Sequence, residues 1–308
     1  MILIRCEDRD EFGYGNRSRA IAIAQYCIRN KLEYSLIYSN KVWGKQLASD
    51  YNCNHLSCQS GTKEEAKELL KKNPLSKSQN NYIFCDGNRF LKSFFVELKK
   101  INIKTILLDD LGYPIRDFVN CVINPNIYAT KEFYLKWGTK IFAGTSNVLL
   151  REEFFKPIEK IKLRPSVLIS LGGTGKVELI DLIKKKLTNK GFKVFIAKGF
   201  SAIQMVEAID KASFVICGAS VGLHEVISRG RIPIPIYQVD DQIYFVKYLK
   251  INKFPFIEGL NRKHEDIAME IISLINYFTD NNTNYLYKNY QFHKESLNSL
   301  IKFFNNEI

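Results

Sequence analysis

The sequence of 308 residues has few histidines, tryptophans and methionines, and it lacks a long apolar run. No stretch approaches the roughly 18 consecutive apolar residues that indicate a membrane-spanning helix. The segment Met1–Arg5 becomes charged at once and has neither the apolar run nor the cleavage site of a secretory signal. We therefore expect a cytosolic protein without a membrane span.

Disulfide and metal-binding patterns are also missing. The seven cysteines are an odd number and form no Cys-x-x-Cys pair, and Cys85 and Cys217 lie in apolar runs. The four histidines are far apart in the sequence. These features favour buried free thiols in a reducing compartment and argue against a structural zinc site. We expect no metal ion and no cofactor.

Acidic residues are scarce relative to basic ones. The 32 acidic and 45 basic residues give a formal charge of +13, with lysine in short runs such as Lys184–Lys186. A positive field favours nucleic acid, an anionic membrane surface or a phosphorylated small molecule. Because no basic stripe, RNA-binding signature or helix-turn-helix pattern is present, we expect no nucleic-acid partner. Peripheral membrane contact and the oligomeric state stay open.

The sequence does contain a regular alternation of short apolar runs with segments of helical period. Strands are predicted at 2–5, 34–38, 82–85, 105–108, 121–123, 141–143, 166–171, 193–197, 214–217, 233–236 and 256–257. Helices are predicted at 19–30, 41–50, 62–72, 88–100, 177–189, 203–210, 221–229, 242–250 and 264–278. This alternation predicts parallel sheets with helices on both faces, an α/β fold.

A charged segment bracketed by prolines, residues 156–165, lacks sustained periodicity and indicates a linker. It separates an N-terminal domain at 1–155 from a C-terminal domain at 166–284. In the tail, 285–308, the spacing of Leu297, Leu300, Ile301 and Phe304 predicts a helix packed on the body of the protein. We expect two doubly wound, Rossmann-type domains that face each other across a cleft.

In open parallel sheets, ligands bind at the carboxyl ends of strands, and the first loop with unusual residues there is 7–19. The turn Gly13-Tyr14-Gly15 allows a close approach of the backbone to a ligand, ahead of a helix N-terminus that favours anions. Ser18 stands where a dinucleotide fingerprint would need its third glycine. A plain tight turn explains the pattern equally well.

Two further loops follow strands of the second half. Gly172-Gly173-Thr174 suits a backbone cradle for phosphate. It is not a P-loop, because that pattern needs a glycine where Ser170 stands and a serine or threonine where Val177 stands. Ala219 and Ser220 lead into a helix whose first amides suit a diphosphate. Glu225 either accepts hydrogen bonds from a ribose diol or is a first-turn glutamate favoured by the helix dipole.

In their order and spacing, these loops resemble the PseG family, the UDP-2,4-diacetamido-2,4,6-trideoxy-β-L-altropyranose hydrolases of the pseudaminic acid pathway. That family is close in fold to the MurG-type glycosyltransferases of the GT-B class. The resemblance covers roughly Ile2 to Leu249. Its carriers are Ile4-Arg5, Gly13-x-Gly15-x-x-x-Arg19, Leu108-Asp109-Asp110, Asn124–Ala129, Leu150–Phe154, Leu171–Thr174, Ala219-Ser220 with Glu225, and Asp241-Gln242.

The resemblance implies a GT-B-like fold and cytoplasmic hydrolysis of a UDP-activated amino or deoxy sugar to free sugar and UDP, in nonulosonic acid or surface-polysaccharide biosynthesis. It also implies the following site residues. UDP would be held by Gly172, Gly173, Thr174, Ala219, Ser220 and Glu225. The sugar or acceptor would be held by Gly13, Tyr14, Gly15 and Arg19, and Asp109 and Gln242 would lie along the cleft.

The sequence departs from the family pattern where the catalytic histidine is expected, because that position is Asn16. An amide orients a nucleophile but cannot deprotonate it. Asp241 and Gly175 also replace an asparagine and an aspartate of the pattern. The candidates for a replacement base are Glu7, Asp8, Asp10 and Asp241. His224 is a further candidate, but its position beside Glu225 on a helix turns it about 100° away, and a structural histidine is favoured.

Three functions therefore stay open. The first is a PseG-like hydrolase in which water attacks the anomeric carbon with inversion. The second is a GT-B glycosyltransferase that moves the sugar from UDP to an acceptor hydroxyl. Asn16 in place of the histidine is compatible with this function, and the net charge of +13 would suit a lipid-linked acceptor at an anionic membrane surface. The third is a nucleotide-sugar-binding protein without catalytic activity.

Overall fold

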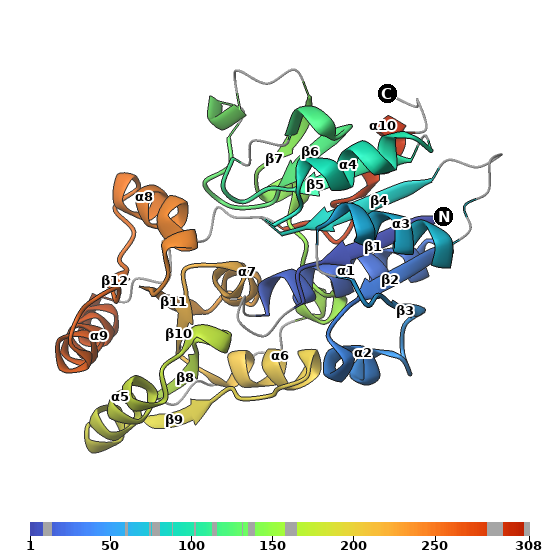
Figure 1. Cartoon of the computed structure of the whole chain (residues 1–308). Helices are drawn as coiled ribbons and strands as arrows, with labels where there is room; N and C mark the ends of the chain where they lie inside the picture. Colours follow the sequence, from blue (N-terminus) through green and yellow to red (C-terminus); the bar gives the residue numbers. More distant parts are fainter. Residues whose placement is uncertain are drawn as a thin grey trace. The chain divides into compact units, whose positions relative to one another are not determined.

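A computed structural model of the chain describes residues 1–8, 14–58, 61–73, 75, 81–87, 89–101, 103–112, 116–130, 132–134, 139–157, 165–281 and 292–304. The chain forms two compact units, one of Met1–Leu149 with His293–Ile308 and one of Leu150–Phe292 (Figure 1). Residues 158–164 of the expected linker lie outside the described residues. The domain boundaries stated above therefore stay predictions.

In its described part, the first unit holds a seven-stranded parallel sheet in the order β3-β2-β1-β4-β5-β6-β7. The strands are β1 (Ile2–Cys6), β2 (Tyr34–Tyr38), β3 (Cys53–His55), β4 (Tyr82–Asp86), β5 (Lys104–Leu108), β6 (Cys121–Asn124) and β7 (Lys140–Ala143). The helices are α1 (Gly15–Arg29), α2 (Lys41–Leu47), α3 (Lys63–Lys72), α4 (Lys92–Lys99) and α10 (Asn298–Phe304). The strand order reverses between β1 and β4, which is the switch point where such sheets bind ligands.

The second unit holds, in its described part, a five-stranded parallel sheet in the order β12-β11-β10-β8-β9. The strands are β8 (Ser166–Ser170), β9 (Lys193–Ile196), β10 (Phe214–Gly218), β11 (Ile232–Tyr237) and β12 (Ile257–Glu258). The helices are α5 (Val177–Asn189), α6 (Ala202–Lys211), α7 (Val221–Ser228), α8 (Ile243–Ile251) and α9 (His264–Asn281). Here the order reverses between β8 and β10.

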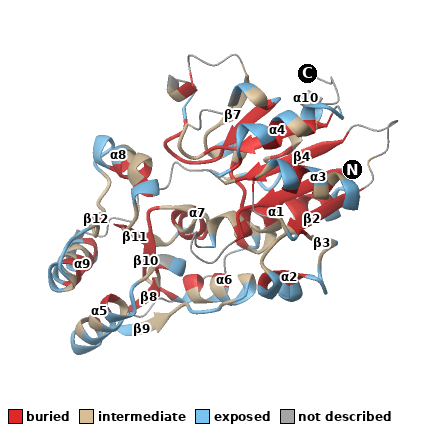
Figure 2. Cartoon of the chain, viewed as in Figure 1, coloured by how far each residue is buried: buried red, intermediate tan, exposed pale blue. Residues whose placement is uncertain are grey.

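The apolar runs of the sequence form these strands because both faces of each sheet are covered. All five residues of β1 and of β4 are buried, as are Val167–Ile169 of β8. Figure 2 shows the buried colour along β1, β2 and β4, whereas the outer faces of α5 and α9 carry the exposed colour. Burial on both faces explains why the strands are continuous apolar runs rather than alternating ones.

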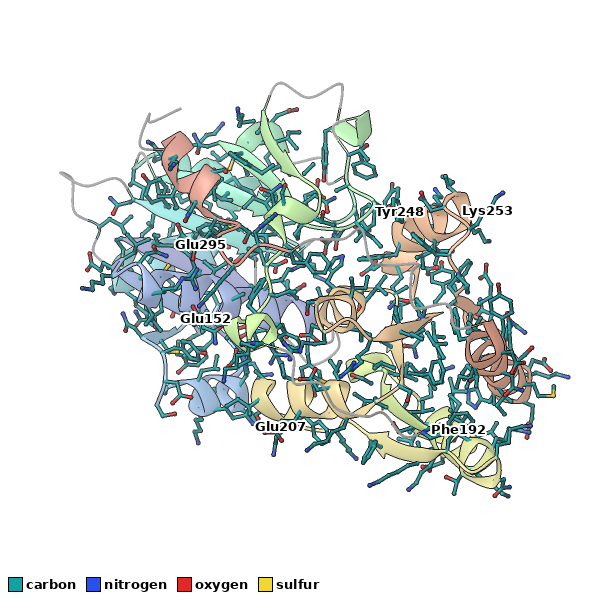
Figure 3. The ribbon with its side chains drawn as sticks, turned by 180° about the vertical axis from the view of Figure 1, so that it is seen from behind. Glu152, Phe192, Glu207, Tyr248, Lys253 and Glu295 are labelled. Atoms are coloured by element: carbon teal, nitrogen blue, oxygen red, sulfur yellow. The ribbon has the colours of Figure 1, made fainter. Side chains whose placement is uncertain are left out.

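The tail helix α10 belongs to the first unit, as expected of a helix packed on the body. Leu297 and Leu300 are buried in the same core cluster as the apolar residues of β1 and α1. Tyr26 donates a hydrogen bond from its hydroxyl to Asn298 Oδ1 at 2.7 Å. Glu295, labelled in Figure 3, pairs with Arg29 at 3.1 Å.

The predicted strands and helices are all found, with bounds that differ by up to four residues, and the structure adds one strand. The short strand β3 was not predicted, because Cys53–His55 is half-buried at the sheet edge and carries no apolar run. Helix α1 begins at Gly15 instead of Arg19, so Asn16 lies in its first turn rather than in a loop.

All seven cysteines are free thiols, and five are buried. None of the described helices combines the length and apolarity that crossing a membrane requires.

Candidate functional site

At the switch point of the first sheet, Arg19 holds together groups from three elements. Its Nε and Nη2 donate to the two carboxylate oxygens of Asp86, at the end of β4, at 2.8 and 2.7 Å. Its Nη1 contacts both oxygens of Asp110, beyond β5, at 2.9 and 2.8 Å. Its Nη2 also donates to Asn16 Oδ1 at 2.9 Å. Arg19 is buried, so this guanidinium fixes the geometry of the switch point.

The orientation of the Asn16 amide follows from this contact. A guanidinium only donates hydrogen bonds, so the carbonyl oxygen of Asn16 must face Arg19 and its Nδ2 must face the other way. Asn16 is half-buried in the first turn of α1. It therefore presents a hydrogen-bond donor, and not a base, to a ligand at the amino end of that helix.

Asp86 is the carboxylate whose titration the fold perturbs most clearly here. It is buried opposite Cys6 in the register of β1 and β4. Burial raises its pKa, Arg19 opposes the rise, and the charges of Asp110 and Glu7 add to it, which brings the pKa of Asp86 to about 6. One cation thus faces more than one carboxylate at this point of the sheet.

Glu7 and Asp8 follow β1 at the same edge but have different surroundings. Glu7 is buried, its backbone N–H donates to Asp86 O at 2.8 Å, and its side chain lies against Gly87, where a Cβ would collide with Glu7 Cγ. Asp8 accepts hydrogen bonds from the backbone N–H groups of Ser39 and Asn40 at 2.6 and 2.7 Å and from the Ser39 hydroxyl at 2.6 Å.

These bonds make Asp8 a poor candidate for a base. Burial tends to raise its pKa, but Arg5 and the hydrogen bonds from Asn40 and Ser39 lower the pKa of Asp8 below its usual value. A carboxylate stabilised in its charged form takes up a proton reluctantly. Asp8 holds the loop between β2 and α2 in place. Asp10 and Gly13 lie outside the described residues.

Asp109 and Asp110 have opposite roles at the end of β5. The Asp109 carboxylate accepts from the backbone N–H groups of Leu111 and Gly112 at 3.1 and 2.8 Å, which closes a turn. Asp110 instead faces Arg19 and accepts from Asn126 Nδ2 at 2.6 Å. The structure therefore brings Asp110, and not the predicted Asp109, to the Arg19 cluster. Tyr14 is exposed, and the Arg17 guanidinium lies over its ring at 5.3 Å.

In the second sheet, the loop after β8 lies at one side of the switch point. Gly172–Thr174 form a 3₁₀ turn with Gly172 at φ +62°, and Gly172 and Gly173 are exposed. A Cβ on Gly172 would meet no atom within 4 Å, so ligand atoms can approach this backbone. At Gly175, a Cβ would lie 2.7 Å from Leu171 Cβ. Packing therefore excludes a side chain where the family pattern has aspartate.

The loop after β10 lies at the other side. Ser220 precedes α7 and makes no side-chain cap, while its backbone N–H donates to Gly218 O at 2.8 Å. Gln242 is buried against this loop: its Oε1 accepts from Gln238 N at 2.7 Å, and a Cβ on Gly218 would lie 3.2 Å from its Nε2. Ala219, Ser220 and Gln242 thus lie together. Asp241 is exposed in the adjoining turn.

Glu225 lies on α7 and forms an ion pair with Arg151 at 2.9 Å between Oε1 and Nη2. Burial raises the pKa of Glu225, and Arg151 opposes that rise. His224 is buried beside the rings of Phe245 and Phe292, with centroids at 5.5 and 5.7 Å. That environment fits a structural histidine. In the described residues, no group of three or more His, Cys, Asp or Glu side chains is arranged to hold a metal ion.

Asp86, Asp110 and Arg151 are site residues that the sequence reasoning did not select. Asp86 directly follows the predicted strand 82–85 and precedes Gly87, which is a usable signal once β4 is known to lie beside β1. Asp110 and Arg151 belong to motifs on which the resemblance rests, but neither had been given a role.

The sequence matches no protein-family profile and no curated protein. The structure is similar to MurG of Acinetobacter baumannii, with a TM-score of 0.61 and 13% identity over 99% of each chain. It is also similar to UGT2 of Phytolacca americana complexed with UDP-2-fluoro-glucose and pterostilbene, with a TM-score of 0.69 and 9% identity over 99% of this chain and 98% of the other.

A third similar structure is the spinosyn rhamnosyltransferase SpnG complexed with thymidine diphosphate, with a TM-score of 0.67 and 10% identity over 98% of this chain and 99% of the other. The fold is therefore that of the GT-B glycosyltransferases, which confirms the predicted α/β class. At these identities the similarity shows the fold alone.

Proposed function

We propose that this protein is a GT-B glycosyltransferase that takes its sugar from a UDP-sugar and moves it to an acceptor hydroxyl. The observation that carries the proposal is the switch point of the second sheet. There, the exposed Gly172–Gly173 turn and the Gly218–Ser220 loop follow the neighbouring strands β8 and β10, and Glu225, the partner of Arg151, follows on α7. The glycosyltransferases of similar structure support transfer over hydrolysis.

In this proposal the second unit holds the nucleotide. The backbone N–H groups of the Gly172–Gly173 turn and of the first turn of α7, beyond Ser220, bind the diphosphate, because amides at such turns and helix ends favour anions. Glu225 accepts hydrogen bonds from the ribose hydroxyls. Gln242 packs against Gly218 and accepts a hydrogen bond from the backbone of Gln238, and so supports this loop.

The first unit supplies the groups for the reacting sugar and acceptor. Asn16 donates its amide N–H to a sugar or acceptor oxygen, held in that orientation by Arg19. Glu7 accepts the proton of the attacking hydroxyl while the bond from the acceptor oxygen to the anomeric carbon forms and the bond to the diphosphate breaks. Glu7 is preferred to Asp8, whose oxygens stabilise a backbone loop, and to Asp86 and Asp110, which hold Arg19.

Hydrolysis is the second candidate, with water in place of the acceptor. It is favoured by the PseG-like run of residues from Gly15 to Arg19, which the structure builds into one hydrogen-bonded turn with Asp86. The net charge of +13 supports an anionic acceptor or an acceptor at an anionic membrane surface, and so supports transfer.

Phosphorus NMR tests both candidates on the full-length chain. UDP-sugars are incubated with and without a pool of hydroxyl acceptors, including lipid-linked ones in anionic vesicles. UDP release that requires an acceptor supports the transferase, and equal release without one supports the hydrolase. Glu7→Gln should abolish either reaction while UDP binding persists. No release under any condition, with UDP bound, would leave a binding protein without catalytic activity.

A further inference from the structure

The Arg151–Glu225 pair links two segments of the second unit that are far apart in sequence. Arg151 precedes a short 3₁₀ turn at Glu152–Phe155, and Glu225 lies in α7. The contact joins Nη2 and Oε1 at 2.9 Å, and the side chains are only 13% and 11% exposed. It uses one oxygen of the carboxylate, so Oε2 stays available to accept further hydrogen bonds.

Among the residues that the structure describes, few other charged groups act on this pair. The charged or titratable groups that act on Glu225, or on which it acts, are Arg151 from the segment before the turn and Cys217 from β10. Burial raises the pKa of the Cys217 thiol far above neutrality, so that thiol is uncharged. Arg151 is then the cation that opposes the rise in the pKa of the buried Glu225 and so favours its ionised form.

The guanidinium itself has a donor to spare. Arg151 packs over the ring of Phe154 at 5.2 Å, and its buried Nε–H has no hydrogen-bond acceptor among the described residues. An unsatisfied buried donor is costly unless a ligand or water completes it. Within the described residues, the pair therefore leaves one carboxylate oxygen, Oε2, and one buried N–H, Nε, without a hydrogen bond.

We propose that Arg151 is a positioning residue for ribose recognition, which acts through Glu225 and makes the second unit select ribonucleotides over deoxyribonucleotides. The inference rests on the proposed nucleotide site and adds the group that makes it selective. A carboxylate binds two neighbouring hydroxyl groups only when it is ionised and correctly turned. Without Arg151, burial would act unopposed and raise the pKa of Glu225 further, which favours the protonated form, and a carboxylic acid accepts such bonds weakly.

The test is calorimetric titration of UDP and 2′-deoxy-UDP into the full chain between about pH 5.5 and pH 8. The wild-type protein should bind UDP about ten-fold more tightly than 2′-deoxy-UDP, the usual size of one hydrogen bond to a charged group. In Arg151→Met this ratio should fall toward one near pH 6 and recover as the pH rises, because Glu225 then ionises only at higher pH. Arg151→Lys should keep most of the ratio.

Arg262→Met is the matched control, because it removes an arginine from an exposed ion pair with Glu270 in the same unit. It should keep the wild-type ratio at every pH. If Arg151→Met does not fold, Glu225→Gln replaces it, with a ratio near one that does not change with pH.

The failures are distinguishable. Wild-type protein that binds neither nucleotide overturns the proposed nucleotide site and this inference with it. Wild-type protein that discriminates, with an unchanged ratio in Arg151→Met or Glu225→Gln, overturns the inference alone. So does a loss of affinity in Arg151→Met that is equal for both nucleotides at every pH, which indicates a structural role.

Discussion

Replacing Asp86 by asparagine tests whether burial or Arg19 controls the charge at the first switch point. The pKa of Asp86 is about 6 in the folded protein and 3.8 in its ordinary state. The folded protein therefore holds this proton more tightly than the unfolded chain does. The stability that Asp86 contributes is fully present below pH 3.8 and is lost as the pH rises through about 6.

The size of the effect follows from the same two values. A shift of about 2 units corresponds to about 3 kcal/mol over the whole titration, of which about 2 kcal/mol fall between about pH 4.5 and pH 7. The amide of the Asp86→Asn variant does not titrate. In this variant an amide N–H would face a guanidinium N–H of Arg19, and the resulting loss of unfolding free energy is the same at every pH.

The assay is urea unfolding of wild type and Asp86→Asn at intervals across this pH range. The difference in unfolding free energy, wild type minus variant, should decrease by about 2 kcal/mol as the pH rises. Asp50→Asn, at an exposed aspartate of the same unit, records the effect of removing a surface carboxylate. A difference that increases with pH would refute the reasoning, because Arg19 would then outweigh burial.

Three further substitutions have defined outcomes. Arg229→Met removes the buried partner of Asp210, held at 2.6 and 2.9 Å, and should lower the unfolding free energy in urea by about 3–5 kcal/mol; a loss below about 1 kcal/mol would contradict the pairing. Gly175→Ala places a methyl 2.7 Å from Leu171 Cβ and should cost about 1–3 kcal/mol in thermal unfolding, with unchanged stability as the contrary result. Asn16→Asp keeps an oxygen facing Arg19 but presents no donor, so UDP release from a UDP-sugar should fall about ten-fold or more. Asn40→Asp, where the side chain accepts hydrogen bonds at a helix N-terminus, should leave that rate unchanged, and equal losses in both variants would contradict the donor role.

The strands could be predicted because their burial on both faces requires continuous apolar runs such as Ile2–Ile4 and Val167–Ile169. Even β11 was recognised despite Pro233 and Pro235. The carbonyl oxygen of Ile236 accepts a hydrogen bond from Ala219 N, just after β10, and that of Tyr237 accepts one from Gly259 N, just after β12. Because alternate residues of a strand point to opposite sides, both prolines face the same side as Tyr237, where pairing with β12 begins only at Ile236. Their missing N–H groups therefore cost little.

The site was less predictable, because the local sequence does not determine the order of the strands in the sheet. Asp86 and Asp110 reach Arg19 across 67 and 91 residues. Their meeting depends on β4 lying beside β1 and β5 lying beside β4, which no spacing rule supplies. The contrast between Asp109 and Asp110 depends on which of two neighbouring side chains turns toward the backbone of its own loop. The ribose, diphosphate and base assignments stay predictions until the experiments above are done.

The return of the chain's last described helix to the first unit affects how the protein is made. Leu297 and Leu300 complete a core whose other members lie before residue 150. A ribosome must therefore synthesise the whole second unit before the first can close its core. We expect the second unit to mature first and the earlier-made first unit to depend longer on chaperones, the reverse of the usual order.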